Sequence, residues 1–337
     1  MSEILAIENF LGKKLKKELG PDKGSVYYSN YIQAKKTLVQ EILPEIKKIE
    51  KNLTDHGPQH IDNVLDNAYK LLGEDIYNLS AFDLYTLCII ILFHDVGIIW
   101  GRKDHHKNIS IIYDYVRKDH NRFRDEKILV TTAVRAHTGE AIDGSKDTLK
   151  DIKNEDYFLD GNSIQLQDLA AILRFSDELA EGRQRTSNFM IENNLFSKNS
   201  RVFHQFSNIT RISIARETNR IVINYDINIP ALNKREISDF KELMKFCYNR
   251  IIKLDEERKY NKHYTNYLSS FKTTSAKFQI YVNDELRQLD LNPIILDDLT
   301  IPGQNSKSIT EIDNNYVLEH ILKKINGTKN KKRNKRF

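Results

Sequence analysis

The stretch IIILFHDVG, residues 89–97, places a histidine and an aspartate at the end of an apolar run. Residues 87–93 are all apolar, which predicts a helix buried on every side. The run is far shorter than the roughly 20 residues that a membrane span requires. Ser80, followed three residues later by Asp83, has the pattern of a helix start, so we expect this central helix over residues 81–94.

The pair His94 and Asp95 therefore lies where burial is expected, and a buried carboxylate without a partner is costly. Taken alone, a core histidine is usually hydrogen-bonded to a carbonyl group. The chain, however, concentrates seven of its ten histidines between residues 56 and 137: His56, His60, His94, His105, His106, His120 and His137. Imidazole groups gathered near a buried carboxylate favour a metal site.

Helical periodicity surrounds this pair on both sides. NLTDHGPQH, residues 52–60, carries His56 and His60 directly before a pattern of apolar residues at three- and four-residue spacing over residues 61–72, which predicts a core-facing helix. Its apolar positions are Ile61, Val64, Leu65, Ala68, Leu71 and Leu72. Further helices are predicted over residues 108–116, 126–136 and 165–180.

Asp177 lies on the inward face of the last of these helices, where an unpaired acid is unfavourable. A salt bridge to Arg174 or Arg183 and a role as a fourth metal ligand are both consistent with that position.

The remainder of the chain has the composition of a globular protein, with 40% hydrophobic and 29% charged residues. Charges interrupt the apolar residues of the N-terminus, so no signal peptide is predicted. Cys88 and Cys247 lie in helical segments and are expected to be buried free thiols. We expect a cytoplasmic protein that contains no membrane span.

The pattern changes near residue 200. Residues 210–215 and 220–226 alternate between apolar and polar side chains and predict a hairpin, followed by a long helix from about residue 234 to 254 or beyond and a strand over 277–282. The predicted fold is mainly α: a helical bundle (residues 1–195), a small α+β accessory region (196–300) and a mostly flexible basic tail (301–337). The accessory region could serve as an oligomer interface, a substrate lid or a regulatory domain.

The order His60, His94-Asp95, Asp177 resembles the HD-domain superfamily of metal-dependent phosphohydrolases, and most closely its HD-CE type. DHHKNIS (residues 104–110) resembles the histidine-rich element after the HD pair. LRFSDEL (residues 173–179) resembles the segment that holds the last aspartate. The HD dipeptide alone is a weak signal, but the ordered set, which covers about residues 50–190, is far more specific.

The resemblance implies a role for each matching residue. His60, His94, Asp95 and Asp177 would bind a first metal ion, and Asp95 would bridge to a second one. His106 and His137 match the ligands of the second ion, and His106 is preferred over His105 because Ser110 lies four residues after it. His56 would protonate the leaving oxygen or orient the phosphate. Apart from the resemblance, Lys103, Arg183 and Arg185 could supply positive charge to a phosphate or could be solvated surface residues.

Two departures limit the analogy. Thr138 follows His137, where binuclear HD-GYP proteins have another histidine, and Ile98 follows Gly97, where they have a lysine. These differences argue against cleavage of cyclic dinucleotides and leave the number of ions at one or two. The mixed imidazole and carboxylate ligands suit Mn, Fe, Zn, Ni or Mg.

The leading hypothesis is a metal-dependent phosphohydrolase that cleaves a phosphoester of a nucleotide, with a metal-activated water as nucleophile. The alternative is a catalytically silent HD fold that binds a nucleotide or a metal ion and regulates a partner. The basic residues of 323–337 are either a solvated end or a weak contact with nucleic acid. Homo-oligomer formation is also left open.

Overall fold

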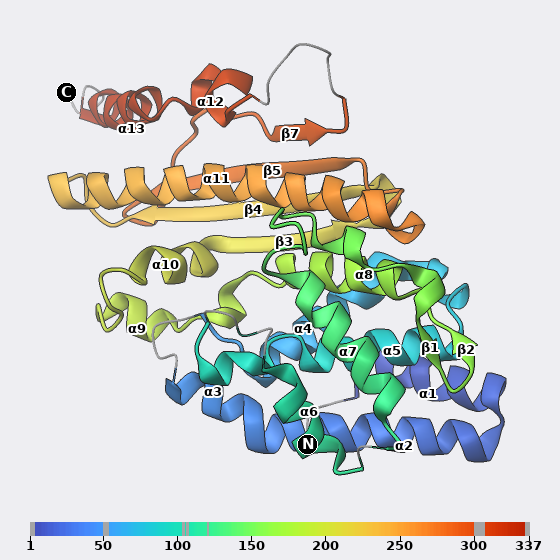
Figure 1. Cartoon of the computed structure of the whole chain (residues 1–337). Coiled ribbons are helices and arrows are strands. Elements are labelled where there is room, and N and C mark those ends of the chain that lie inside the picture. Colours follow the sequence, from blue (N-terminus) through green and yellow to red (C-terminus); the bar gives the residue numbers. More distant parts are fainter. Residues whose placement is uncertain are drawn as a thin grey trace. The chain divides into compact units, whose positions relative to one another are not determined.

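The computed structural model describes residues 4–49, 54–102, 105, 108–119, 121–299 and 307–333, with side chains described up to residue 326. The chain forms two compact units (Figure 1). Unit 1 contains residues 1–180 and Tyr260–Ser270, and unit 2 contains Glu181–Lys259 and residues 271–337. The sequence placed the end of the helical domain at residue 195, whereas the contacts divide the chain after Ala180.

Unit 1 is a helical bundle with one short hairpin. Its elements are α1 (Ala6–Leu19), α2 (Pro21–Thr37), α3 (Leu43–Ile49), α4 (Pro58–Leu72), α5 (Ala81–Phe93), α6 (Ile109–Arg117), α7 (Arg124–His137), β1 (Phe158–Leu159), β2 (Asn162–Ser163) and α8 (Leu166–Glu178). The mainly α fold is confirmed. Each helix predicted from periodicity in this unit lies within two residues of its expected bounds, except that α4 begins three residues before its expected start.

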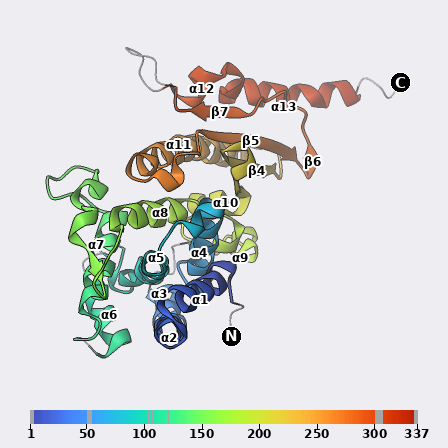
Figure 2. The same ribbon diagram turned by 90° about the vertical axis from the view of Figure 1, so that its right-hand side faces the viewer.

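Helix α5 is the centre of unit 1. Ser80 and Asp83 form the predicted capping box, and all thirteen residues of α5 are buried. Figure 2 shows α5 end-on among the other helices of the bundle, and it packs against α1, α2, α4, α7 and α8. The stretch Ala81–Trp100 is long and apolar enough to cross a membrane. However, 94% of its 18-residue apolar segment is buried inside the protein, as in a core helix.

Helix α4 begins after Gly57 with Pro58 at its first turn, a position where the missing N–H of proline costs nothing. All six apolar positions predicted to face the core are buried. Cys88 and Cys247 are buried free thiols, as predicted.

Unit 2 contains a mixed sheet with a long crossover helix. Its elements are α9 (Asn188–Glu192), α10 (Arg201–Ile209), β3 (Thr210–Ala215), β4 (Arg220–Ile229), α11 (Lys234–Tyr264), β5 (Thr273–Val282), β6 (Glu285–Leu286), β7 (Ile294–Asp297), α12 (Ile309–Ile312) and α13 (Leu318–Arg333). The last turn of α11 belongs to unit 1. The hairpin, the long helix and the later strand all follow the prediction.

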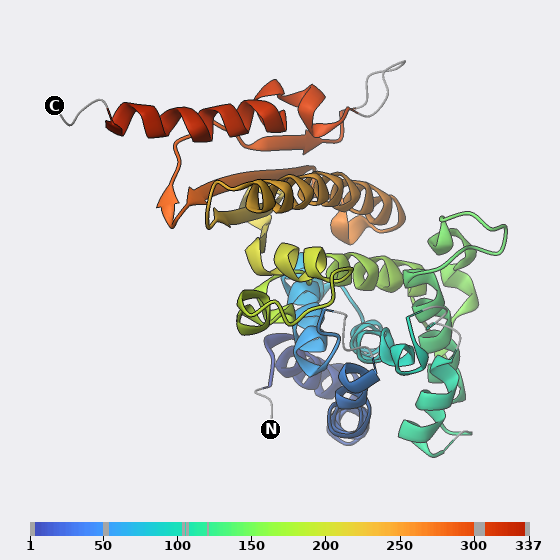
Figure 3. The same ribbon diagram turned by 90° about the vertical axis from the view of Figure 1, so that its left-hand side faces the viewer.

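The sheet order is β3-β4-β5, with β6 and β7 both paired to β5. β3 and β4 are antiparallel, whereas β4 and β5 are parallel because α11 carries the chain back between them. Figure 3 shows α11 running beside these strands. Tyr248 of α11 packs edge-on against Phe278 of β5, and both rings contact Tyr316.

The C-terminal segment differs from the flexible tail that the sequence predicted. Ile321 and Ile325 of α13 are buried, and the Lys324 ammonium donates to the Leu289 carbonyl. Ile321 and Ile325 are spaced four residues apart and so share the side of the helix that packs, while Lys323 is exposed. Residues 300–306 and 334–337 lie outside the described residues.

Candidate metal centre

The ends of three helices bring the first four candidate ligands together. His60 is the third residue of α4, His94 caps the C-terminus of α5, and Asp95 follows it directly. Asp177 comes from the last turn of α8. All four lie in unit 1, and the first three side chains are buried while Asp177 keeps 28% of its side chain exposed.

The ligand atoms of this first group converge on one point. Nε2 of His60 lies 3.3 Å from Nε2 of His94, 3.4 Å from Oδ2 of Asp95 and 3.1 Å from Oδ1 of Asp177. Nε2 of His94 lies 3.3 Å from Oδ2 of Asp95 and 3.6 Å from Oδ1 of Asp177. Atoms that share one ion at about 2.0–2.2 Å are about 3.0–3.6 Å apart, so this group fits a single divalent cation.

The Asp95 carboxylate also belongs to a second group. Its Oδ1 lies 3.7 Å from Nε2 of His105 and 3.8 Å from Nε2 of His137, the last residue of α7. Asp95, His105 and His137 together form a three-residue cluster with the donor types of a metal site. The two oxygens of Asp95 therefore face different sets of histidines.

Hydrogen bonds to the backbone orient three of these rings. Nδ1 of His94 contacts the Ile91 carbonyl at 2.8 Å, Nδ1 of His105 the Arg102 carbonyl at 3.0 Å and Nδ1 of His137 the Val134 carbonyl at 2.6 Å. A carbonyl can only accept, so Nδ1 carries the proton in each ring. Nε2 is left to bind a metal ion, which is the arrangement that metal-binding histidines adopt.

Gly97 allows the His105 segment to approach Asp95. A Cβ atom at residue 97 would lie 1.8 Å from the His105 carbonyl oxygen, a distance that no side chain tolerates. Glycine is therefore required at residue 97 on steric grounds, because it lets the backbone of residue 105 pack directly on the turn after Asp95.

The carboxylates and imidazoles shift one another's pKa values. Burial alone would raise the pKa of Asp95, but the charges of His94 and His56 hold it well below its usual range. Burial would likewise lower the pKa of His94, but the Asp95 charge and a hydrogen bond to Asp177 keep it well above its usual value. For His105, burial is the stronger effect and lowers the pKa, which favours the neutral, metal-binding ring.

His56 lies beside the cluster, just before α4. Its Nδ1 is 2.8 Å from Oδ2 of Asp95, so the carboxylate accepts the Nδ1 proton and fixes the ring. His56 is therefore hydrogen-bonded to the same oxygen that faces the first metal group.

The structure describes only two of the other four predicted site residues. His106 and Lys103 lie outside the described residues. Arg183 and Arg185 belong to unit 2, where Arg183 donates to the Asn208 carbonyl at 2.7 Å and the buried Arg185 pairs with Glu181 at 2.7 Å. Their assignment to phosphate binding stays a prediction.

His105 is the site residue that the sequence reasoning passed over. The DHHKNIS element offers two adjacent histidines, and their spacing from Ser110 favoured His106. The observation that identifies His105 is the position of its Nε2, 3.7 Å from Oδ1 of Asp95, which depends on tertiary structure and is not visible in the spacing.

Comparison with protein families agrees with this geometry. Residues 50–258, more than half of the chain, match the HD-CE family, and this range contains every ligand of both groups. No curated protein and no solved structure matches the chain. The histidine–aspartate cluster and the extent of the match show that the chain belongs to the HD-CE family of HD domains.

Proposed function

We propose that this protein is a metal-dependent phosphohydrolase that cleaves a phosphoester of a nucleotide. The observation that carries the proposal is the position of Asp95, whose two carboxylate oxygens face separate groups of nitrogen and oxygen donors. A carboxylate placed in this way can join two ions, and paired ions are a common device for displacement at phosphorus.

The donor set supports binding of a divalent metal ion. His60 and His94 with Asp95 and Asp177 form the first subsite, and His105 and His137 with Asp95 form the second. Imidazole and carboxylate ligands suit Mn, Fe, Zn, Ni or Mg. A divalent ion held there supplies positive charge for the phosphoryl oxygens and acidifies water.

His56 has the geometry of a proton donor. Asp95 accepts from Nδ1 and fixes the ring, so Nε2 is the nitrogen that can exchange a proton with the leaving oxygen. An imidazole titrates near neutral pH, which suits general acid catalysis. Asp95 thus orients His56 and also contributes to both metal groups.

Membership of an HD-type family and phosphate chemistry both support the proposed substrate class. Lys103, Arg183 and Arg185 are proposed to contact the phosphate groups, because guanidinium and ammonium groups bind phosphate oxygens. A cytoplasmic location, homo-oligomer formation and a weak contact between the basic C-terminal residues and nucleic acid are further parts of the proposal that remain to be tested.

A turnover screen tests the proposal. Metal-stripped protein is loaded with each candidate ion and assayed for release of phosphate or nucleoside monophosphate from a nucleotide panel. We expect one ion and one nucleotide class to give turnover, and Asp95→Asn to abolish it. Asp125→Asn, an isosteric change at an exposed position of α7, is the matched control and should retain activity. Metal binding without turnover on any substrate would favour the silent binding module instead.

A further inference from the structure

We propose that Arg174 is a positioning residue that fixes His137 for the second metal subsite, and that the last turn of α11 holds Arg174 in this role. The inference rests on the proposed two-ion function and adds residues that do not touch either ion. It starts from the end of α7.

The C-terminus of α7 has carbonyl groups that the helix itself cannot satisfy. The Val134 carbonyl accepts from the ring of His137, and the Ala136 carbonyl accepts from the hydroxyl of Thr148 at 2.5 Å and from Nη1 of Arg174 at 3.4 Å. Two side chains from outside the helix therefore bind the peptide group directly before His137. A cation at this end of a helix is also stabilised by the helix dipole.

Arg174 comes from α8, the helix that also carries the metal ligand candidate Asp177. It lies on α8, three residues before Asp177, and its Nη1 also donates to the Thr148 hydroxyl at 3.0 Å. One planar guanidinium group thus bonds both Thr148 and the Ala136 carbonyl.

Tyr260 of α11 holds the guanidinium group from the other side. The Arg174 guanidinium carbon lies 4.6 Å from the centre of the Tyr260 ring, within the range of a cation–π contact. The Tyr260 hydroxyl accepts from the Leu149 amide at 2.9 Å and donates to Asp147 at 3.0 Å. Arg174 is therefore enclosed between a fixed ring and the segment that caps α7.

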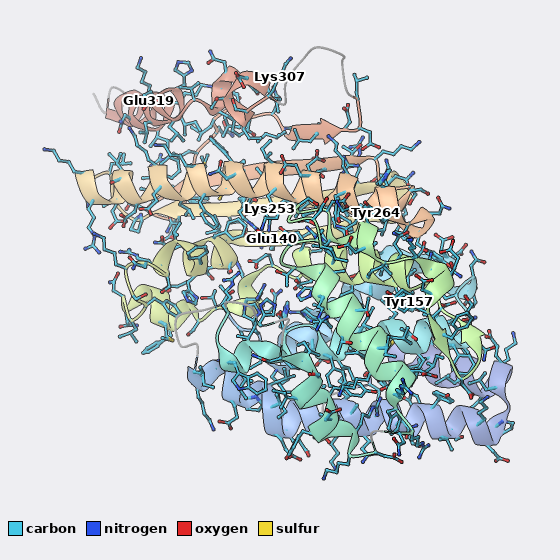
Figure 4. All side chains as sticks on the ribbon, in the orientation of Figure 1. Glu140, Tyr157, Lys253, Tyr264, Lys307 and Glu319 are labelled. Carbon is cyan, nitrogen blue, oxygen red and sulfur yellow. The ribbon has the colours of Figure 1, made fainter. Side chains whose placement is uncertain are left out.

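Two more contacts anchor the end of α11 in unit 1. The hydroxyl of Tyr264, labelled in Figure 4, lies 2.5 Å from Asp147, and the Thr265 hydroxyl lies 2.7 Å from Asp168 of α8. The first residues of α11 belong to unit 2, so this single helix links the accessory region covalently to the support of His137.

The test compares Arg174→Met with Arg124→Met, a control that removes an exposed arginine at the opposite end of α7. The metal-free proteins are titrated with Co²⁺ and followed by the visible ligand-field spectrum. We expect Arg174→Met and Tyr260→Leu to weaken the second equivalent of Co²⁺ by about 10–100-fold, as loss of an orienting contact does, and to leave the first equivalent unchanged. Equal weakening of both equivalents, or no change, would overturn the proposal.

Hydrogen exchange provides a readout that requires no metal. In the metal-free protein, amides in the last turn of α7 should exchange faster in Arg174→Met than in the wild type and in Arg124→Met. If the wild type binds only one equivalent of Co²⁺, the two-ion function fails, and this exchange comparison alone decides the role of Arg174. Unchanged exchange would refute it. If Arg174→Met does not fold, Thr148→Val, which loses only a hydroxyl, carries the same comparison.

Discussion

Asp95 belongs to both metal groups, because its two oxygens serve different neighbours. Oδ2 faces His56, His60 and His94, and Oδ1 faces His105 and His137. The surrounding imidazoles hold the pKa of Asp95 well below its usual range, so the group stays ionised at neutral pH. Its charge then compensates the cations, whether protons or metal ions, that the buried histidines bind.

His56 and His60 are four residues apart but should differ in function. His60→Ala removes a nitrogen from the first metal group and should lose both metal and activity. His56→Ala should retain the metal and lower kcat by about 10²–10⁴-fold, because only proton transfer is affected. Metal content and single-turnover rates of the two variants check this division. Equal loss of metal in both would contradict it.

Substitutions of the two adjacent histidines of DHHKNIS should also differ in their effect on metal binding. His105→Ala should lose the second equivalent of metal, because Nε2 of His105 is directed at Oδ1 of Asp95. The first equivalent should remain bound. His106→Ala is the matched comparison, and a metal titration that shows the loss with His106→Ala and not with His105→Ala would restore the assignment made from spacing.

Metal affinity should depend on pH. Burial opposes protonation of His94, yet Asp95 and Asp177 raise its pKa well above the ordinary value, so a proton occupies the ring of the metal-free protein at neutral pH. A metal ion must displace that proton. Affinity should therefore fall by about tenfold per pH unit for each proton displaced as the pH decreases below the raised pKa. Chelator competition between about pH 8 and about pH 6 measures this slope, and a flat profile would contradict the prediction.

At the scale of elements, helix ends place the ligands. His94 and His137 each end a helix and bond the carbonyl three residues earlier, so the helix geometry itself sets the ring orientation. The helices were predictable because their apolar residues repeat with the helical period. The 3₁₀ turns Val96–Trp100 and Thr148–Asp151 were not, because their conformation depends on contacts with distant segments.

Gly97→Ala tests the close approach at the first of these turns. The added methyl group would overlap the His105 carbonyl, so we expect a loss of about 1–3 kcal/mol in stability and a weaker second metal equivalent. Gly161→Ala is the control, because its Cβ meets nothing within 4 Å and only its positive φ is strained. Thermal unfolding and a metal titration measure both effects. A Gly97→Ala protein that binds the second equivalent normally would show that the contact does not position His105.

At the scale of the whole molecule, sequence patterns predicted the helices and strands of each unit better than the residues at which the units begin and end. The hairpin and long helix of unit 2 were evident from alternation and helical spacing. The return of Tyr260–Ser270 to unit 1 was not, because it depends on hydrogen bonds between residues about a hundred positions apart, such as Tyr260 with Asp147. The packing of α13 was likewise not predicted, because its many lysines obscure the four-residue spacing of its buried isoleucines.

The C-terminal segment gives a prediction at this scale. Ile321→Ala should destabilise the protein by about 2–5 kcal/mol, because Ile321 is fully buried. Deletion of residues 327–337 leaves the buried Ile321 and Ile325 in place and should destabilise the protein by much less than Ile321→Ala does. Denaturant unfolding distinguishes the two. Equal destabilisation by both changes would show that the terminal residues pack as well. The same deletion should weaken any salt-dependent binding of nucleic acid.

The metal content of the purified protein and of Asp95→Asn decides whether the histidine–aspartate cluster is a metal centre. Both proteins are loaded with Mn²⁺ or Fe²⁺, freed of excess ion and analysed by mass spectrometry for bound metal. We expect metal in the wild type, at up to two ions per chain, and a loss of metal in Asp95→Asn, because both groups share this carboxylate. A wild-type protein that binds no metal after loading would mean that the histidine–aspartate cluster is structural.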